Sequence, residues 1–133
     1  MSKNCTLEEI AGLLLKNGSF VLCPHVSPDG DALGSTLALK MALEKAGKQV
    51  TVMVDDDVPK AFGFLPQFDS FVKPDVNNPV AADLLVVLDA SSLDRIGKVA
   101  QAVKYNAMVN IDHHISNTQY ADYLYLNTEA AAT

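Results

Sequence analysis

The sequence predicts an α/β fold in which a parallel sheet carries helices on both faces. Segments typical of buried strands alternate along the chain with segments of helical periodicity, as in strand–helix–strand units. The strand segments are apolar at both alternating sets of positions, as expected for strands covered on both faces. A chain of 133 residues is long enough for one domain with a substantial core, so we expect a single domain.

The N-terminal segments predict a helix followed by a strand. A capping box formed by Thr6 and Glu9 begins a short amphipathic helix, which ends before Gly18. Residues 19–26 form the first predicted strand, and Pro24 is expected to make its last residues irregular.

The next segments repeat this alternation. Residues 31–46 place apolar side chains on one stripe and precede Gly47, which predicts a helix with a glycine at its C-terminal end. Residues 49–54 form a predicted strand, and residues 55–57 are its exit turn.

The C-terminal half contains two further predicted strands. Residues 84–88 and 107–111 have the apolar pattern of buried strands, and a shorter helix is predicted around Ile96, Val99 and Val103. The polar segments 55–60, 73–79 and 116–122 are short connections, and none of them separates domains.

Composition limits the classes of function. Lys and Arg number 10 against 16 Asp and Glu, a net charge of −6, which argues against binding nucleic acid through a basic face alone. The chain has no Trp and 7% aromatic residues, so no stacking platform for single strands is evident. Glycine-rich motifs for dinucleotides or for the phosphates of nucleoside triphosphates are also absent.

The sequence also indicates the surroundings of the protein. No apolar run approaches the ~20 residues of a membrane span, and the first residues do not resemble a secretory signal. We therefore expect a cytoplasmic protein without a membrane partner. Cys5 and Cys23 lie in unrelated contexts, and we expect both to be reduced thiols.

Residues capable of chemistry follow three of the predicted strands. They are His25, Asp29, Asp31, Asp89, Asp112, His113 and His114. The carboxyl ends of parallel strands share one edge of the sheet, where ligands bind in open α/β folds. We therefore predict that these side chains converge in space.

Carboxylates and imidazoles without cysteine make a hard oxygen and nitrogen site, which suits Mn²⁺, Mg²⁺ or iron. Several carboxylates packed together repel one another unless cations are present, so a pair of metal ions bridged by one Asp is the simplest arrangement. Two such ions roughly 3.5–4 Å apart activate water and neutralise a phosphate, as in phosphoester hydrolysis. The metal ions, more than the few basic residues, would attract an anionic substrate.

Each of these residues also has a structural interpretation. Asp29 and Asp31 could form a turn and a helix cap, Asp89 could cap a helix, and His25 could be an ordinary buried histidine. The consecutive Asp112-His113-His114 after an apolar strand is harder to explain in this way.

Two other polar groups favour structural roles. The acidic residues 55–57 are expected to be a solvated turn, although they lie on the same edge of the sheet. Asp94 and Arg95 are expected to form a surface pair.

Three motifs resemble those of the DHH phosphoesterase family. They are HVSPDGDALGS beginning at His25, LD ending at Asp89, and IDHH ending at His114, and they occur in the family's order. The resemblance implies a Rossmann-like DHH domain. Ser35, Asn117 and the DRIG sequence beginning at Asp94 are most similar to nanoRNases and 3′,5′-adenosine-bisphosphate phosphatases, close to cyclic-dinucleotide phosphodiesterases.

The resemblance implies a metal-dependent hydrolase with two Mn²⁺ ions, with Mg²⁺ or another divalent ion as the alternative. One ion would be held by His25, Asp29 and Asp89, and the other by Asp31, Asp89 and His113. Asp89 would bridge the two ions.

The resemblance also implies roles around the metal ions. Asp112 would orient His113, and Ser35 would lie behind the ligands or contact the substrate. His114 would donate a hydrogen bond or a proton at the scissile phosphate. The substrate would be a short oligonucleotide, a nucleotide bisphosphate or the product of a cyclic dinucleotide, and the sequence leaves this choice open.

Family members carry a fourth motif and a C-terminal substrate domain, and neither occurs in these 133 residues. We therefore expect residues 1–133 to be an incomplete N-terminal DHH domain. Two alternatives to an active phosphodiesterase or phosphatase remain open. One is a catalytically weak or inactive metal- or nucleotide-binding fragment, whose apolar helix faces could pair in a homodimer.

The other alternative is a receiver-like signalling domain, which has a similar length and an acidic pocket at the strand ends. Such a domain would have an acidic pair after its first strand and a Lys after its last. Asp112-His113-His114 stands at the latter place, which disfavours this alternative.

Overall fold

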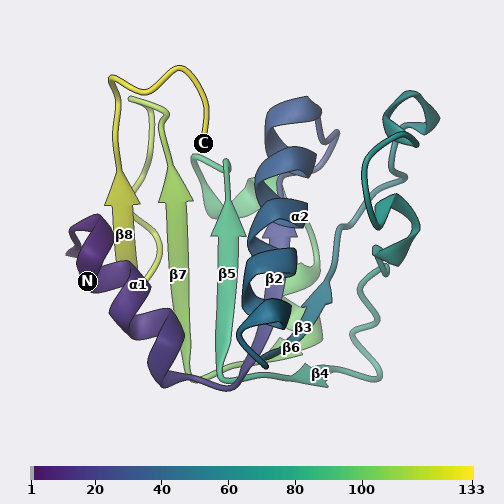
Figure 1. The fold of residues 1–133 in the computed structure, drawn as a ribbon, viewed down its shortest axis with the longest axis horizontal. Helices are drawn as coiled ribbons and strands as arrows, with labels where there is room; N and C mark the ends of the chain where they lie inside the picture. Colours follow the sequence, from purple (N-terminus) through teal and green to yellow (C-terminus); the bar gives the residue numbers. More distant parts are fainter. Residues whose placement is uncertain (1) are drawn as a thin grey trace.

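The computed structural model describes residues 2–133 and contains a six-stranded parallel sheet (Figure 1). Every neighbouring pair of strands runs parallel, so the predicted α/β class is confirmed. In spatial order the strands are β1 (Lys3–Asn4), β8 (Tyr123–Leu126), β7 (Ala107–Asp112), β5 (Leu84–Leu88), β2 (Ser19–Pro24) and β3 (Gln49–Val52). A separate pair joins β4 (Val80–Ala81) to β6 (Val103–Lys104).

The central strands are covered on both faces, as their two-sided apolar pattern predicts. In β2, Phe20 and Leu22 belong to one hydrophobic cluster, whereas Val21 and Cys23 belong to the other. All five residues of β5 are buried. This alternation follows from the two-residue repeat of a strand.

Helices α1 (Leu7–Lys16) and α2 (Gly30–Lys45) cover one face of the sheet (Figure 1). Ile10 and Leu14 of α1 and Leu43 of α2 are buried in the cluster that contains Phe20 and Leu22. The predicted capping box of α1 is present, because Thr6 accepts from the Glu9 backbone and Glu9 accepts from the Thr6 backbone.

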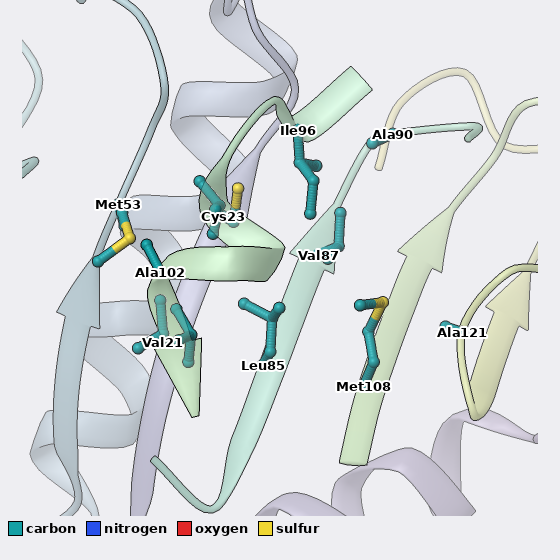
Figure 2. Packing of buried hydrophobic residues seen from close by; sticks show 12 residues of the cluster. Val21, Cys23, Met53, Leu85, Val87, Ala90, Ile96, Ala102, Met108 and Ala121 are labelled. Atoms are coloured by element: carbon teal, nitrogen blue, oxygen red, sulfur yellow. The ribbon is translucent and has the colours of Figure 1, made fainter. Parts of the chain in front are cut away.

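The opposite face carries much shorter elements, the 3₁₀ helix η3 (Leu93–Ile96) and α3 (Val99–Ala102). Ile96 and Ala102 belong to the same hydrophobic cluster as Val21 and Leu85 of the sheet (Figure 2). Helical elements therefore lie on both faces, but with unequal lengths.

The helical stretch predicted around Ile96, Val99 and Val103 is present but divided into η3 and α3, and it ends before Val103. Gly97 separates η3 from α3 with a backbone φ of +59°, outside the helical region. A Cβ at Gly97 would lie 2.3 Å from a carboxylate oxygen of Asp55, so the close approach also requires glycine. Val103 belongs to β6 rather than to a helix.

Other predicted boundaries differ by a few residues. Strand β2 ends at Pro24, two residues earlier than predicted, and β3 ends at Val52 because Met53 forms only an isolated bridge to Val72. Strands β1, β4, β6 and β8 were not predicted. Residues 55 and 56 form a bend where the exit turn was predicted.

Two smaller expectations concern membranes and disulfides. Among residues 2–133, the helices are too short or too polar to cross a bilayer. Cys5 and Cys23 are free thiols, as predicted.

Candidate metal centre

The predicted site residues come together at one edge of the sheet. Strands β2, β5 and β7 are neighbours in the order β7-β5-β2, and their carboxyl ends lie at the same edge (Figure 1). His25 follows β2, Asp89 follows β5, and Asp112 is the last residue of β7. Adjacent parallel strands therefore bring together residues that are far apart in the sequence.

Asp89 lies at the middle of this group. It is 3% exposed, and its carboxylate oxygens lie 3.5 Å from Nε2 of His25 and 3.1 Å from Nε2 of His113. Its backbone has a φ of 65°, in the left-handed region that non-glycine residues seldom occupy. The backbone N–H of Asp89 donates to the carbonyl of Ile111 at 2.9 Å, which fixes this conformation against β7. Backbone conformations of this kind concentrate at functional sites.

One half of the site is formed by His25 and Asp29. Nε2 of His25 lies 3.7 Å from Oδ1 of Asp29, in addition to its contact with Asp89. Asp29 is also the N-cap of α2, because its Oδ1 accepts from the Ala32 backbone at 2.9 Å. The structural interpretation of Asp29 as a cap and its place in the site are therefore compatible.

The other half is formed by His113 and Asp31. Nε2 of His113 lies 3.3 Å from Oδ2 of Asp31 and 3.1 Å from Oδ1 of Asp89. Ser35 donates its hydroxyl to Oδ1 of Asp31 at 3.0 Å, one helical turn along α2. Ser35 thus lies behind Asp31, one of the two positions that the resemblance implies.

Thr133 contacts the same half and was not predicted. Its backbone N–H lies 3.0 Å from each carboxylate oxygen of Asp31, and its hydroxyl donates to Asp89 at 3.0 Å. The last residues of the chain lie over this edge of the sheet (Figure 1). No sequence pattern within the chain indicates this contact, because it joins residues about 100 positions apart.

Asp112 contacts His114 rather than His113, which differs from what the resemblance implies. Oδ1 of Asp112 lies 2.6 Å from Nδ1 of His114, and Oδ2 accepts from the side chain of Asn117 at 2.8 Å. The Asp112 side chain has no exposed area, whereas that of His114 is 41% exposed. The buried carboxylate therefore orients a histidine that reaches the surface of the site.

Asn110 supports this network and was also not predicted. It is fully buried in β7, donates to the carbonyls of Val87 and Ala90, and accepts from Asn117 at 2.7 Å. A polar residue inside an otherwise apolar strand is a signal that could have indicated it, because buried amides require partners.

The two histidines close to Asp89 suit metal binding by their ring orientation. Nδ1 of His25 lies 2.6 Å from the carbonyl of Val26, and Nδ1 of His113 lies 3.2 Å from the carbonyl of Ala130. A neutral ring that donates from Nδ1 to a carbonyl presents a lone pair at Nε2. Both Nε2 atoms face carboxylate oxygens, so each gap requires either a proton or a cation.

The pKa shifts reflect this arrangement. The hydrogen bond with Asp89 raises the pKa of His25, although burial acts against it. Burial lowers the pKa of His113, but the Ala130 carbonyl and the charge of Asp89 outweigh it, so the pKa is raised overall. The anionic surroundings thus favour positive charge at the same positions where a metal ion would lie.

The donor set fits divalent cations. Ligand atoms of His25, Asp29 and Asp89 lie within 4.8 Å of one another, and the same holds for a second group that shares Asp89. The second group consists of Asp89, Asp112, His113 and His114. Oxygen and imidazole ligands of this kind suit hard or intermediate metal ions.

Open space adjoins both halves of the site. A cavity of about 320 Å³ is lined by His25, Asp29, Asp89, Ala90, Ser91, Arg95, His114 and Ser116. A second cavity of about 230 Å³ adjoins His113, Asp112 and Thr133. A small ligand can therefore reach the group from solvent.

The remaining polar candidates have structural roles or differ from expectation. Asp55 accepts a hydrogen bond from the Lys98 backbone, and Asp56 accepts one from the Ser27 backbone. The acidic segment is therefore hydrogen-bonded to two other loops. Asp94 accepts from the Ser92 hydroxyl. The predicted pair between Asp94 and Arg95 is wrong, since no ion pair joins them.

Comparison with known proteins agrees with this geometry. The profile described as DHH family, N-terminal domain, matches residues 19–133. The chain belongs to the DHH family. This DHH domain is 34% identical over 116 residues to the bifunctional oligoribonuclease and PAP phosphatase NrnA of Thermus thermophilus, covering 87% of the chain and 34% of that protein.

Two further relatives support the same family. A probable bifunctional oligoribonuclease and PAP phosphatase NrnA of Streptococcus mutans is 29% identical over 114 residues, covering 86% of the chain and 35% of that protein. The crystal structure of an exopolyphosphatase-related protein from Bacteroides fragilis has a TM-score of 0.80 and 25% identity, covering 94% of the chain and 39% of that protein. The DHH domain thus spans about a third of the length of the curated relatives it matches.

Proposed function

We propose that this DHH domain is the metal-binding part of a phosphoesterase that hydrolyses short oligonucleotides or nucleotide bisphosphates. The observation that carries the proposal is the position of Asp89, whose two carboxylate oxygens face Nε2 of His25 and Nε2 of His113. A carboxylate between two imidazoles is a natural bridge between two cations.

The ligands divide into two sets that share Asp89. His25, Asp29 and Asp89 would hold one ion, and Asp31, Asp89 and His113 would hold the other. When bound, the two ions would activate water and neutralise charge on the phosphoryl group. Mn²⁺ is the proposed metal because its preferences span carboxylate and imidazole ligands, and Mg²⁺ is the alternative.

His114 is the proposed proton donor to the leaving oxygen. Its Nδ1 is engaged with Asp112, which leaves Nε2 as the atom that would hold the transferable proton. Asp112 keeps the ring in one orientation, as a buried carboxylate does for other catalytic histidines. The open space beside His114 is the proposed place of the substrate.

The proposed substrates follow from the relatives. Both NrnA proteins are named as oligoribonucleases and PAP phosphatases, so a short RNA and a nucleotide bisphosphate are the first compounds to test. A linear product of a cyclic dinucleotide has the same phosphodiester bond as a short RNA. We propose these substrates for the protein to which residues 1–133 belong as the N-terminal DHH domain.

Metal binding and hydrolysis test the proposal together. We would titrate the protein with Mn²⁺ by calorimetry and then assay a diribonucleotide and adenosine 3′,5′-bisphosphate for release of mononucleotide and phosphate. Asp89→Asn should abolish hydrolysis of both substrates. Asp83→Asn is the matched control, because Asp83 precedes the same strand at the opposite edge of the sheet.

The outcomes separate the alternatives. Mn²⁺-dependent hydrolysis that depends on Asp89 supports the proposal. Mn²⁺ binding without hydrolysis would identify a metal-binding module, and a protein that binds no divalent ion would contradict the proposal altogether.

A further inference from the structure

Arg95 is the only arginine of the chain, and it lines a cavity next to the candidate metal centre. It lies on η3 and lines the 320 Å³ cavity together with His25, Asp89 and His114. It is the only Lys or Arg among the lining residues. The one guanidinium of a chain with a net charge of −6 therefore lies at the cavity that the proposed metal ligands line.

The backbone of Arg95 is fixed to the site. Its carbonyl accepts from the Val26 backbone at 2.6 Å, and its N–H donates to the Ser92 carbonyl at 3.1 Å. Val26 directly follows His25, and the neighbouring Ile96 is fully buried. These hydrogen bonds therefore fix the position of the Arg95 backbone relative to His25.

The guanidinium itself has no partner within residues 2–133. The ion pairs of this part of the chain involve Lys and His but not Arg95, and its side chain donates no hydrogen bond. Asp29 and Asp89 line the same cavity without pairing with it. A fixed backbone that carries a free cationic side chain is suited to an external anion.

The chemistry of the side chain identifies that anion. A guanidinium presents a planar set of donors that matches two oxygens of a phosphate, and it remains charged at every relevant pH. Asp29 and Asp89 would repel a phosphate in the absence of cations, so Arg95 alone would not suffice. The anion should bind only when the metal ligands are occupied.

We propose that Arg95 binds non-bridging phosphoryl oxygens of the substrate on the His25 side of the metal centre. This inference rests on the proposed function and adds a residue that selects for a phosphate group. The fork of donors would also orient the phosphoryl group toward His114, which lines the same cavity.

The test measures metal and phosphate binding separately. Calorimetric titration with Mn²⁺ alone comes first, followed by titration of the Mn²⁺-saturated protein with adenosine 5′-monophosphate. The variants are Arg95→Ala, Arg95→Lys and, as a matched control, Lys98→Ala, which removes an exposed cation three residues away that does not line the cavity.

Arg95→Ala should leave Mn²⁺ affinity unchanged and weaken the nucleotide by roughly 10-fold to 100-fold, as expected for loss of charged hydrogen bonds. Arg95→Lys should recover only part of the affinity, because an ammonium lacks the planar fork. Lys98→Ala should behave as the unmodified protein does. In the hydrolysis assay, KM should rise most in Arg95→Ala, less in Arg95→Lys and not at all in Lys98→Ala.

Any of three results would overturn the inference while leaving the proposed function intact. One is equal nucleotide affinity in Arg95→Ala and the unmodified protein, and another is a Mn²⁺-loaded unmodified protein that binds no nucleotide. Loss of Mn²⁺ affinity in Arg95→Ala would also overturn it, since Arg95 would then support the ligands. If the unmodified protein binds no Mn²⁺ in the first titration, the proposed function itself fails.

Discussion

Strand β5 has an aspartate before its first residue and another after its last, and the two carboxylates have opposite surroundings. Asp83 accepts backbone N–H groups from Gly18 at 2.8 Å and Ser19 at 3.1 Å. Asp89 instead faces the imidazoles of His25 and His113. The same residue type is therefore tied to the backbone at one edge and directed into a cluster of ligands at the other.

The difference extends to the rest of each edge. At the edge formed by the amino ends of the strands (the amino edge), Asp122 accepts from the Met108 backbone at 2.8 Å, so it too has a backbone donor. At the carboxyl edge, the carboxylates of Asp31 and Asp89 instead lie close to imidazole nitrogens of His25 and His113. An acid satisfied by backbone N–H groups stabilises the fold, whereas acids that face one another and imidazoles require a cation.

The largest expected effect comes from Asp89→Asn at the carboxyl edge. Loss of a charge that would bridge the two proposed ions should reduce kcat/KM by more than about 100-fold, because even the residues that support metal ligands contribute 10-fold to 100-fold. Asn tolerates the left-handed conformation that Asp89 adopts, so the fold should persist. Kinetic assays and thermal unfolding followed by circular dichroism measure both effects. Activity that survives in this variant would remove Asp89 from the centre.

Asp112→Asn should have the next largest effect and tests the network behind His114. The change removes the charge that orients the ring of His114, so kcat should fall roughly 10-fold to 100-fold while KM changes little. Mn²⁺ affinity measured by calorimetry should remain that of the unmodified protein. A fall in Mn²⁺ affinity would instead show Asp112 to be a ligand, which its proximity to Asp89 and His113 allows.

Asp83→Asn at the amino edge should have the smallest effect, and on stability alone. The N–H groups of Gly18 and Ser19 lower the pKa of Asp83 below its ordinary value of 3.8, so the ionised form stabilises the folded state. This contribution is fully present above pH 3.8 and is lost as the pH falls through the lowered pKa.

Unfolding in urea at several pH values measures this contribution. The unmodified protein should be more stable than Asp83→Asn near neutral pH, and the difference should shrink in acid. Mn²⁺ affinity should not change in the variant. A loss of Mn²⁺ binding comparable to that of Asp89→Asn would erase the distinction between the two edges.

Much of the fold was predictable because its main signals are local. The two-sided apolar pattern of β2, β5 and β7 follows directly from burial on both faces, and the caps of α1 and α2 depend on residues within a few positions. The convergence of His25, Asp89 and His113 then follows from parallel strands that share an edge.

The rest could not be predicted because it depends on distant contacts. The helix expected around Ile96 is divided at Gly97, whose close approach to Asp55 joins residues 42 positions apart. Thr133 contacts Asp31, which lies 102 positions earlier in the sequence. The pairing of Asp112 with His114 depends on side-chain rotation at the end of β7, which neither hydrophobic periodicity nor spacing determines.

The central claim is that Asp89 joins two cations in one centre, and electron paramagnetic resonance of the Mn²⁺-loaded protein tests it most directly. We expect two Mn²⁺ per chain and a spectrum of a magnetically coupled pair, because ions bridged by one carboxylate lie roughly 3.5–4 Å apart. Asp89→Asn should lose the coupling. A spectrum of single, isolated Mn²⁺ in the unmodified protein, or no bound Mn²⁺ at all, would contradict the claim.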